Sequence, residues 1–141
     1  MNRIETIAPE IVGLMEEASA FKRYQVLVAV CSTAIEASEA KFDAVLSSLE
    51  EFQRTGLIVG RIRVELEALT NRLDEEYFDY QDSGDEKLAL QRFHQARAVA
   101  ALAFAGDKSN RISALEAIYE AAAAVDNSQI IIEKVRSMFS I

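Results

Sequence analysis

The sequence predicts an all-α protein, and three observations support this fold class. The 141 residues include one proline and five glycines, so few residues interrupt long helices. Apolar residues recur at spacings of three and four along most of the chain, which is the period of an α-helix. No segment shows the strict two-residue alternation of a half-buried strand. The length fits a single helical domain, residues 1–141, built as an up-and-down bundle of about five or six helices.

The first half of the chain predicts a short helix followed by a long one. Pro9 fits the first turn of the short helix. A heptad seam then predicts one long helix that ends near Gly56, where a glycine suits the C-cap. The hydroxyls of Ser32 and Thr33 can bond to the preceding turn, so a break there stays open. The residues of the seam are Phe21, Tyr24, Val28, Cys31, Ile35, Ser38, Phe42, Val45, Leu49 and Phe52.

The seam continues through a third helix that ends at Ser83-Gly84-Asp85. The tight break at Thr55-Gly56 predicts that the second and third helices form a long antiparallel hairpin, on which the bundle is built. Four apolar residues of the second helix are expected to face four of the third. The two sets are Ile35, Phe42, Val45 and Leu49, and Ile62, Leu66, Leu69 and Leu73.

Three further helices are expected in the second half of the chain. The fourth, residues 87–105, becomes alanine-rich and ends at Gly106. Ser109 or Asn110 can cap the fifth helix, and Asp126 or Asn127 can cap the last. The residues predicted to point inward are Ile112, Leu115, Ile118, Tyr119, Ala122 and Val125 in the fifth helix, and Ile130, Ile131, Val135, Met138 and Phe139 in the last.

Composition narrows the class of protein. Cys31 is the only cysteine, which excludes a disulfide within the chain and predicts a reducing, cytoplasmic setting. We expect no secretion signal in the acidic, proline-containing N-terminus, and no membrane span, because the longest apolar run, residues 98–105, is too short. The formal net charge of −8 disfavours direct binding to nucleic acid.

Nearly all of that charge lies in one segment. Residues 74–86, DEEYFDYQDSGDE, contain seven carboxylates and no Lys or Arg, and so carry −7 of the formal −8. A solvated helix end explains Asp85 and Glu86, which a following helix N-terminus favours. It does not explain acids in the last turns of the third helix, where the helix dipole disfavours them and neighbouring like charges repel.

A basic protein partner would explain this segment, because concentrated charge steers association and interleaved aromatic residues are typical of binding hot spots. The sequence therefore predicts a non-catalytic, cytoplasmic protein-binding module that needs no cofactor. The residues predicted to contact the partner are Asp74, Glu75, Tyr77, Asp79, Tyr80 and Asp82. A further alternative stays open, in which the chain is a non-catalytic helical protein that binds no ligand and forms a homodimer through the long hairpin.

An alternative function uses two carboxylate motifs. Glu36 and Glu39 form ExxE, and Glu76 and Asp79 form ExxD. Two such motifs facing each other resemble the magnesium site of all-α nucleotide pyrophosphohydrolases of the MazG and dUTPase type, since Mg²⁺ prefers oxygen ligands. The basic residues that bind phosphate in that family have no clear counterparts here. His94 is the only histidine, so the sequence also lacks a zinc or di-iron pattern.

The second half of the chain resembles a class of bacterial proteins. The segments LDEEYFDYQDSGDEKLALQRFHQARAVAALAFA and ALEAIYEAAAAVDN are similar to the small acidic helical immunity proteins of secreted bacterial toxins. The likeness rests on an acidic helix end, an FxxAR helix and an EAIYEA helix. It implies a cytoplasmic, non-enzymatic inhibitor that masks a toxin domain, commonly a basic nuclease, through acidic and aromatic side chains.

Overall fold

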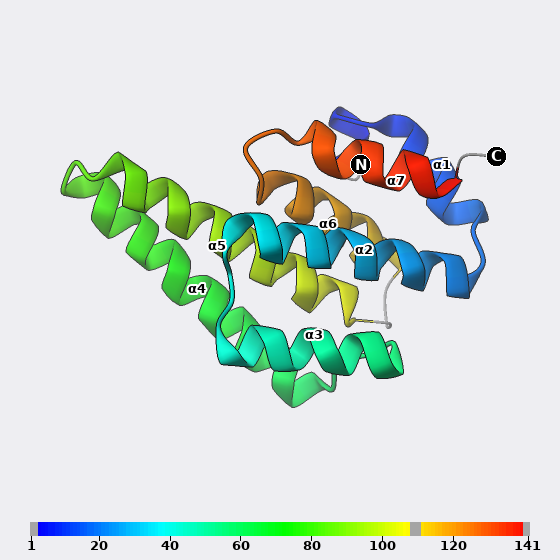
Figure 1. Ribbon diagram of the computed structural model, residues 1–141, viewed down its shortest axis with the longest axis horizontal. Coiled ribbons are helices and arrows are strands. Elements are labelled where there is room, and N and C mark those ends of the chain that lie inside the picture. Colours follow the sequence, from blue (N-terminus) through cyan, green and yellow to red (C-terminus); the bar gives the residue numbers. More distant parts are fainter. Residues whose placement is uncertain (1–2, 108–110, 140–141) are drawn as a thin grey trace.

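The computed structural model describes residues 3–107 and 111–139, and within them every regular element is a helix (Figure 1). This confirms the all-α fold class, although the described residues form seven α-helices where five or six were expected. In chain order the elements are a short 3₁₀ helix η1 (Arg3–Thr6), then α1 (Pro9–Glu17), α2 (Ala20–Ser38), α3 (Asp43–Thr55), α4 (Gly60–Asp82), α5 (Glu86–Ala105), α6 (Arg111–Ala123) and α7 (Gln129–Phe139).

The predicted long second helix is two helices, α2 and α3, which are separated at Glu39. Glu39 has a left-handed backbone (φ 59°), and the N–H of Ala40 donates to the carbonyl of Ile35 at 3.2 Å. This is a Schellman ending, in which buried Ala40 and Ile35 supply the usual apolar contact. The Gln95 side-chain amide also donates to the Glu39 carbonyl at 3.3 Å, which ties the corner to α5.

The break near Ser32 and Thr33, which the sequence left open, is absent, and α2 is continuous there. The Thr33 hydroxyl does donate to the carbonyl of Ala29 at 2.9 Å, as its position suggested. The helix nevertheless continues to Ser38, because such a bond adds to the helical ladder without replacing it.

The long antiparallel hairpin is formed by α4 and α5, which corrects the prediction that the second and third helices pair. α4 packs chiefly against α5 and has only a small contact with α3. The chain leaves α3 at Gly56 and runs through Leu57–Val59, and the side chain of Ile58 lies against Gly106 at the end of α5. The turn that folds the hairpin is Ser83–Asp85, in which Gly84 has φ 83°. Phe42, one of the residues expected in that seam, precedes α3 and is half-buried against the core.

The core lies where α2, α5 and α6 pack together, and small side chains dominate it. Residues 95–105 of α5 are all buried apart from Arg97 and Phe104, and most of them are alanine. Alanine lets neighbouring helix backbones approach closely, which explains why this stretch can be enclosed by two helices. α1, η1 and α7 cover the other side of α2 and α6.

The last helices follow the predicted pattern with local differences. Ser128 directly precedes α7, and the predicted cap Asn127 lies one residue before it. The side-chain oxygen of Asn127 accepts from the backbone N–H of Gln129, the first residue of α7, at 3.1 Å. The predicted caps Ser109 and Asn110 lie outside the described residues. Ile112 and Ile130 were expected to be buried, but both are about half-exposed; Ile132 is fully buried instead of Ile130. Across residues 3–107 and 111–139, no helix is both long enough and apolar enough to cross a membrane.

Candidate functional site

The acidic segment lies on a projecting part of the α4–α5 hairpin. We call residues 74–93 the acidic arm; it comprises the end of α4, the turn and the first part of α5. In Figure 1 the turn of this hairpin lies at the far left, well beyond the ends of the other helices. Ala89 is the only buried residue of residues 74–93, so the arm consists almost entirely of surface.

Two of the arm's carboxylates are held by arginines of α5. Both oxygens of Asp74 accept from Nη2 of Arg97, at 3.0 and 2.8 Å. Oε1 of Glu76 accepts from Nε of Arg92 at 2.9 Å, and Arg72 lies 3.7 Å from its other oxygen. These ion pairs offset part of the cost of placing acids at the end of α4, and those with Arg92 and Arg97 hold α4 against α5.

Asp74 belongs to an ion-pair network at the base of the arm. Arg97 also donates to Glu120 of α6 at 3.0 Å, and Arg3 of η1 donates to the other oxygen of Glu120 at 2.7 Å. Glu120 is only 3% exposed, so the network joins four elements around a buried carboxylate. A cavity of about 390 Å³ lies beside Asp74 and Arg97. Asp74 was predicted to contact a partner, but the structure gives it an internal ion pair.

Glu75, Asp79 and Asp82 lie on the surface of the arm, which a recognition site would require. All three are exposed, and they form no ion pair with any residue of 3–107 or 111–139. Asp85 caps α5 by accepting from the backbone N–H of Leu88 at 3.1 Å, and Glu86 lies in the first turn of α5. The helix-dipole explanation therefore applies to Asp85 and Glu86, but not to the other three acids.

The two predicted tyrosines lie along the seam between the helices of the arm. The ring of Tyr77 packs against that of Phe93, with the centroids 5.5 Å apart, and its hydroxyl accepts from Gln81 at 3.0 Å. The guanidinium of Arg92 lies 5.7 Å from the centre of the Tyr80 ring. Both tyrosines are half-buried, so each supports the hairpin and leaves only part of its ring accessible.

Phe78 is the most exposed aromatic residue of the arm, and the predicted contact set did not include it. Phe78 is 58% exposed, and Leu90 on α5 is 51% exposed. The sequence did contain a signal for Phe78. It lies three residues after Glu75 and four before Asp82, and this spacing puts the three side chains on one helix face. The arm thus presents an apolar ring among unpaired carboxylates.

The carboxylates of the alternative metal site do not assemble. Glu36 on α2 pairs with Lys41 at 3.2 Å, and Glu76 is held by Arg92. The described part of the chain contains no group of three or more Asp, Glu, His or Cys side chains that could hold a metal ion. Cys31 is fully buried, and burial raises the pKa of its thiol to about 12, so the thiol is a poor nucleophile at neutral pH.

Comparisons of the chain with protein-family models, with curated proteins and with solved structures found no match. The chemistry of the arm therefore has to be judged from its own residues. Unpaired carboxylates around an exposed aromatic ring can attract and anchor a positively charged macromolecule.

Proposed function

We propose that this protein is a non-catalytic binding module whose acidic arm recognises a positively charged partner protein. One observation carries the proposal: exposed Phe78 lies on the same helix face as the unpaired carboxylates of Glu75 and Asp82, on a hairpin that projects from the molecule. Like charges on neighbouring turns weaken a helix, so this arrangement favours a role in binding over a role in folding.

Charge and apolar surface would have different parts in the complex. The carboxylates would steer a basic partner toward the arm and raise the association rate, most strongly at low salt. Phe78 and Leu90 would enter apolar pockets of the partner and slow dissociation, as buried aromatic anchors do. A second copy of the chain presents the same carboxylates, so charge disfavours dimerisation through the two arms.

We further propose that the partner is a toxin domain and that the protein acts as its cytoplasmic immunity protein. The resemblance of the second half of the chain to acidic helical immunity proteins supports this specific form of the function. Such a protein would inhibit by covering the partner's basic surface, a role that needs neither a metal ion nor a catalytic residue.

The proposal is tested by capture of a partner with charge variants of matched size. The arm variant combines Glu75→Gln, Asp79→Asn and Asp82→Asn. The control variant combines Glu17→Gln, Glu50→Gln and Glu65→Gln, three exposed acids outside the arm. Both variants lose three negative charges. A difference in binding between them therefore reports the local field of the arm and not the net charge of the protein.

The bait is the full chain, and the candidate partner is the product of the neighbouring reading frame or a protein captured from the native host. We expect the original protein and the control variant to retain a basic protein that the arm variant loses. Equal retention by all three would contradict the proposal and leave the acids as a solvated helix end. Restored growth of cells that express the partner would test inhibition separately from binding.

A further inference from the structure

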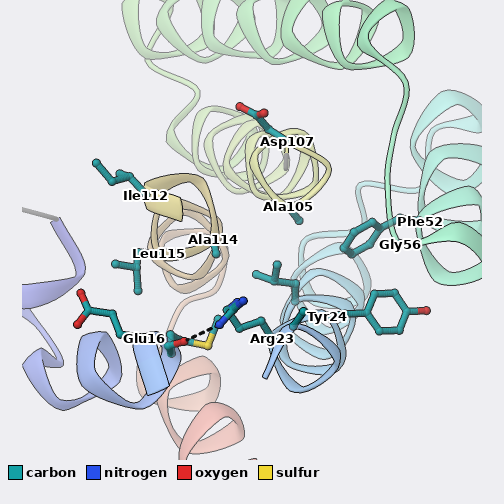
Figure 2. Close-up of a pocket in the computed structure, with 13 residues that line it drawn as sticks. Glu16, Arg23, Tyr24, Phe52, Gly56, Ala105, Asp107, Ile112, Ala114 and Leu115 are labelled. Atoms are coloured by element: carbon teal, nitrogen blue, oxygen red, sulfur yellow. Dashed lines mark hydrogen bonds between the residues drawn. The ribbon is translucent and has the colours of Figure 1, made fainter. Parts of the chain in front are cut away.

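A cavity on the opposite part of the molecule from the arm has the features of a small-molecule site. Its volume is about 300 Å³, at the lower end of the range for ligand pockets. It lies where the ends of α1, α3 and α5 meet the beginnings of α2 and α6 (Figure 2). Leu27, Phe52 and Leu115 give it apolar walls, and the small side chains of Ala105 and Ala114 leave the space open.

Three charged residues line this cavity, Glu16, Arg23 and Asp107, and Arg23 is the one cation among them. The half-buried side chain of Arg23 uses Nη1 to donate to the carbonyls of Met15, at 3.5 Å, and of Ala18. Its Nε and Nη2 make no hydrogen bond with the described residues, and no carboxylate among them forms an ion pair with it. A partly desolvated guanidinium with unused donors favours an anionic acceptor.

The acids that line the cavity do not satisfy Arg23. The carboxylate of Asp107 accepts from the Ser113 hydroxyl at 3.2 Å and lies 3.6 Å from Arg63. Figure 2 shows the carboxylates of both Asp107 and Glu16 directed away from Arg23. Repulsion of an anion by the whole molecule is also weak here, since residues 74–86 of the arm carry −7 of the formal −8.

We infer that this cavity binds a small amphipathic carboxylate, with its apolar body against Leu27, Phe52 and Leu115 and its carboxylate on Nε and Nη2 of Arg23. The pairing of a charge-assisted hydrogen bond with apolar burial would select such a ligand over a neutral one of the same shape. This site is separate from the acidic arm, and its existence does not depend on the proposed function.

Octanoate and octanol are suitable probes, because they share a chain and differ in the head group. Calorimetric titration of the full chain should give octanoate an affinity at least about tenfold higher than octanol, the factor of a hydrogen bond to a charged group. Lengthening the acid from hexanoate to octanoate should tighten binding about fourfold per methylene while the chain still fits.

Two variants with matched controls locate the site. Arg23→Met should lower octanoate affinity about tenfold or more and leave octanol binding unchanged, whereas Arg61→Met, at an exposed arginine of α4, should change neither. Ala114→Leu should weaken both probes by filling the cavity, and Ala68→Leu on the exposed face of α4 should not. Circular dichroism would establish that each variant is folded.

Three results would overturn the inference. They are an absence of octanoate binding at millimolar concentration, equal affinities for octanoate and octanol, and full retention of octanoate affinity in folded Ala114→Leu. The Ala114→Leu result keeps the test decisive if Arg23→Met fails to fold after losing its bonds to α1.

Discussion

The two halves of α5 have opposite environments within one continuous helix. Residues 86–93 belong to the projecting part of the α4–α5 hairpin (Figure 1), and Ala89 alone among them is buried. Residues 95–105 belong to the core that α5 forms with α2 and α6, and only Arg97 and Phe104 among them are not buried. The first half can change its surface at little cost in stability, whereas the second half sets the stability of the fold.

Charged residues also have different roles on the arm and at its base. In the arm, Glu75, Asp79 and Asp82 are exposed to solvent, and none of them forms an ion pair with a described Lys or Arg. At the base of the arm, Asp74 and Glu120 are held by arginines and join the hairpin to the core. Acidic residues close in sequence therefore differ in role, and only the structure distinguishes them.

The largest expected effect compares two leucines of α5. Leu102→Ala should destabilise the protein by about 3–5 kcal/mol, because Leu102 is fully buried and truncation leaves a cavity. Leu90→Ala should cost less than about 1 kcal/mol, since Leu90 is 51% exposed. Urea denaturation of both variants measures the difference, and similar losses would show that the arm is as well packed as the core.

The next effect compares a buried carboxylate with an exposed one. Glu120→Gln should cost about 3 kcal/mol, since it removes the charge that Arg3 and Arg97 share in a buried position. Glu133→Gln should cost less than about 0.5 kcal/mol, because the Glu133 side chain is 66% exposed and its pair with Arg136 lies at the surface. Denaturation at two salt concentrations checks both values. A loss at Glu120 no greater than at Glu133 would mean that the network contributes nothing to the junction.

The smallest stability effects compare two glycines and should have opposite signs. A Cβ at Gly106 would lie 2.7 Å from the side chain of Ile58, so Gly106→Ala should destabilise by about 1–3 kcal/mol. A Cβ at Gly13 would meet nothing within 4 Å, and Gly13→Ala within α1 should stabilise by about 0.5–1 kcal/mol. Thermal unfolding of both variants measures whether each substitution stabilises or destabilises the protein. A neutral Gly106→Ala would show that α5 and the Ile58 segment separate easily.

Local chemistry explains which elements could be predicted from the sequence. Pro9, Gly56, Asp85 and Gly106 marked helix ends correctly, because capping depends on one residue and its neighbours. The end of α2 at Glu39 carried no such signal, since glutamate rarely adopts a left-handed backbone. The spacing of Leu66 and Leu73 identified the apolar face of α4 but could not show that α5 would cover it.

The same limit applies to the candidate site. Exposure of Glu75, Asp79 and Asp82 could be expected from their number and spacing. The internal pairing of Asp74 could not, because Arg97 lies 23 residues away along the chain. Phe78 could have been found from its position between Glu75 and Asp82 on one helix face.

The most direct test of the arm's role is the kinetics of partner association at low and at physiological salt. The variant with Glu75→Gln, Asp79→Asn and Asp82→Asn should associate at least about tenfold more slowly at low salt, with a weaker salt dependence. Phe78→Ala should mainly raise the dissociation rate, and the control variant at Glu17, Glu50 and Glu65 should match the original protein in both rates. Association by the arm variant that is as fast and as salt-dependent as that of the original protein would contradict the claim that these carboxylates form a recognition surface.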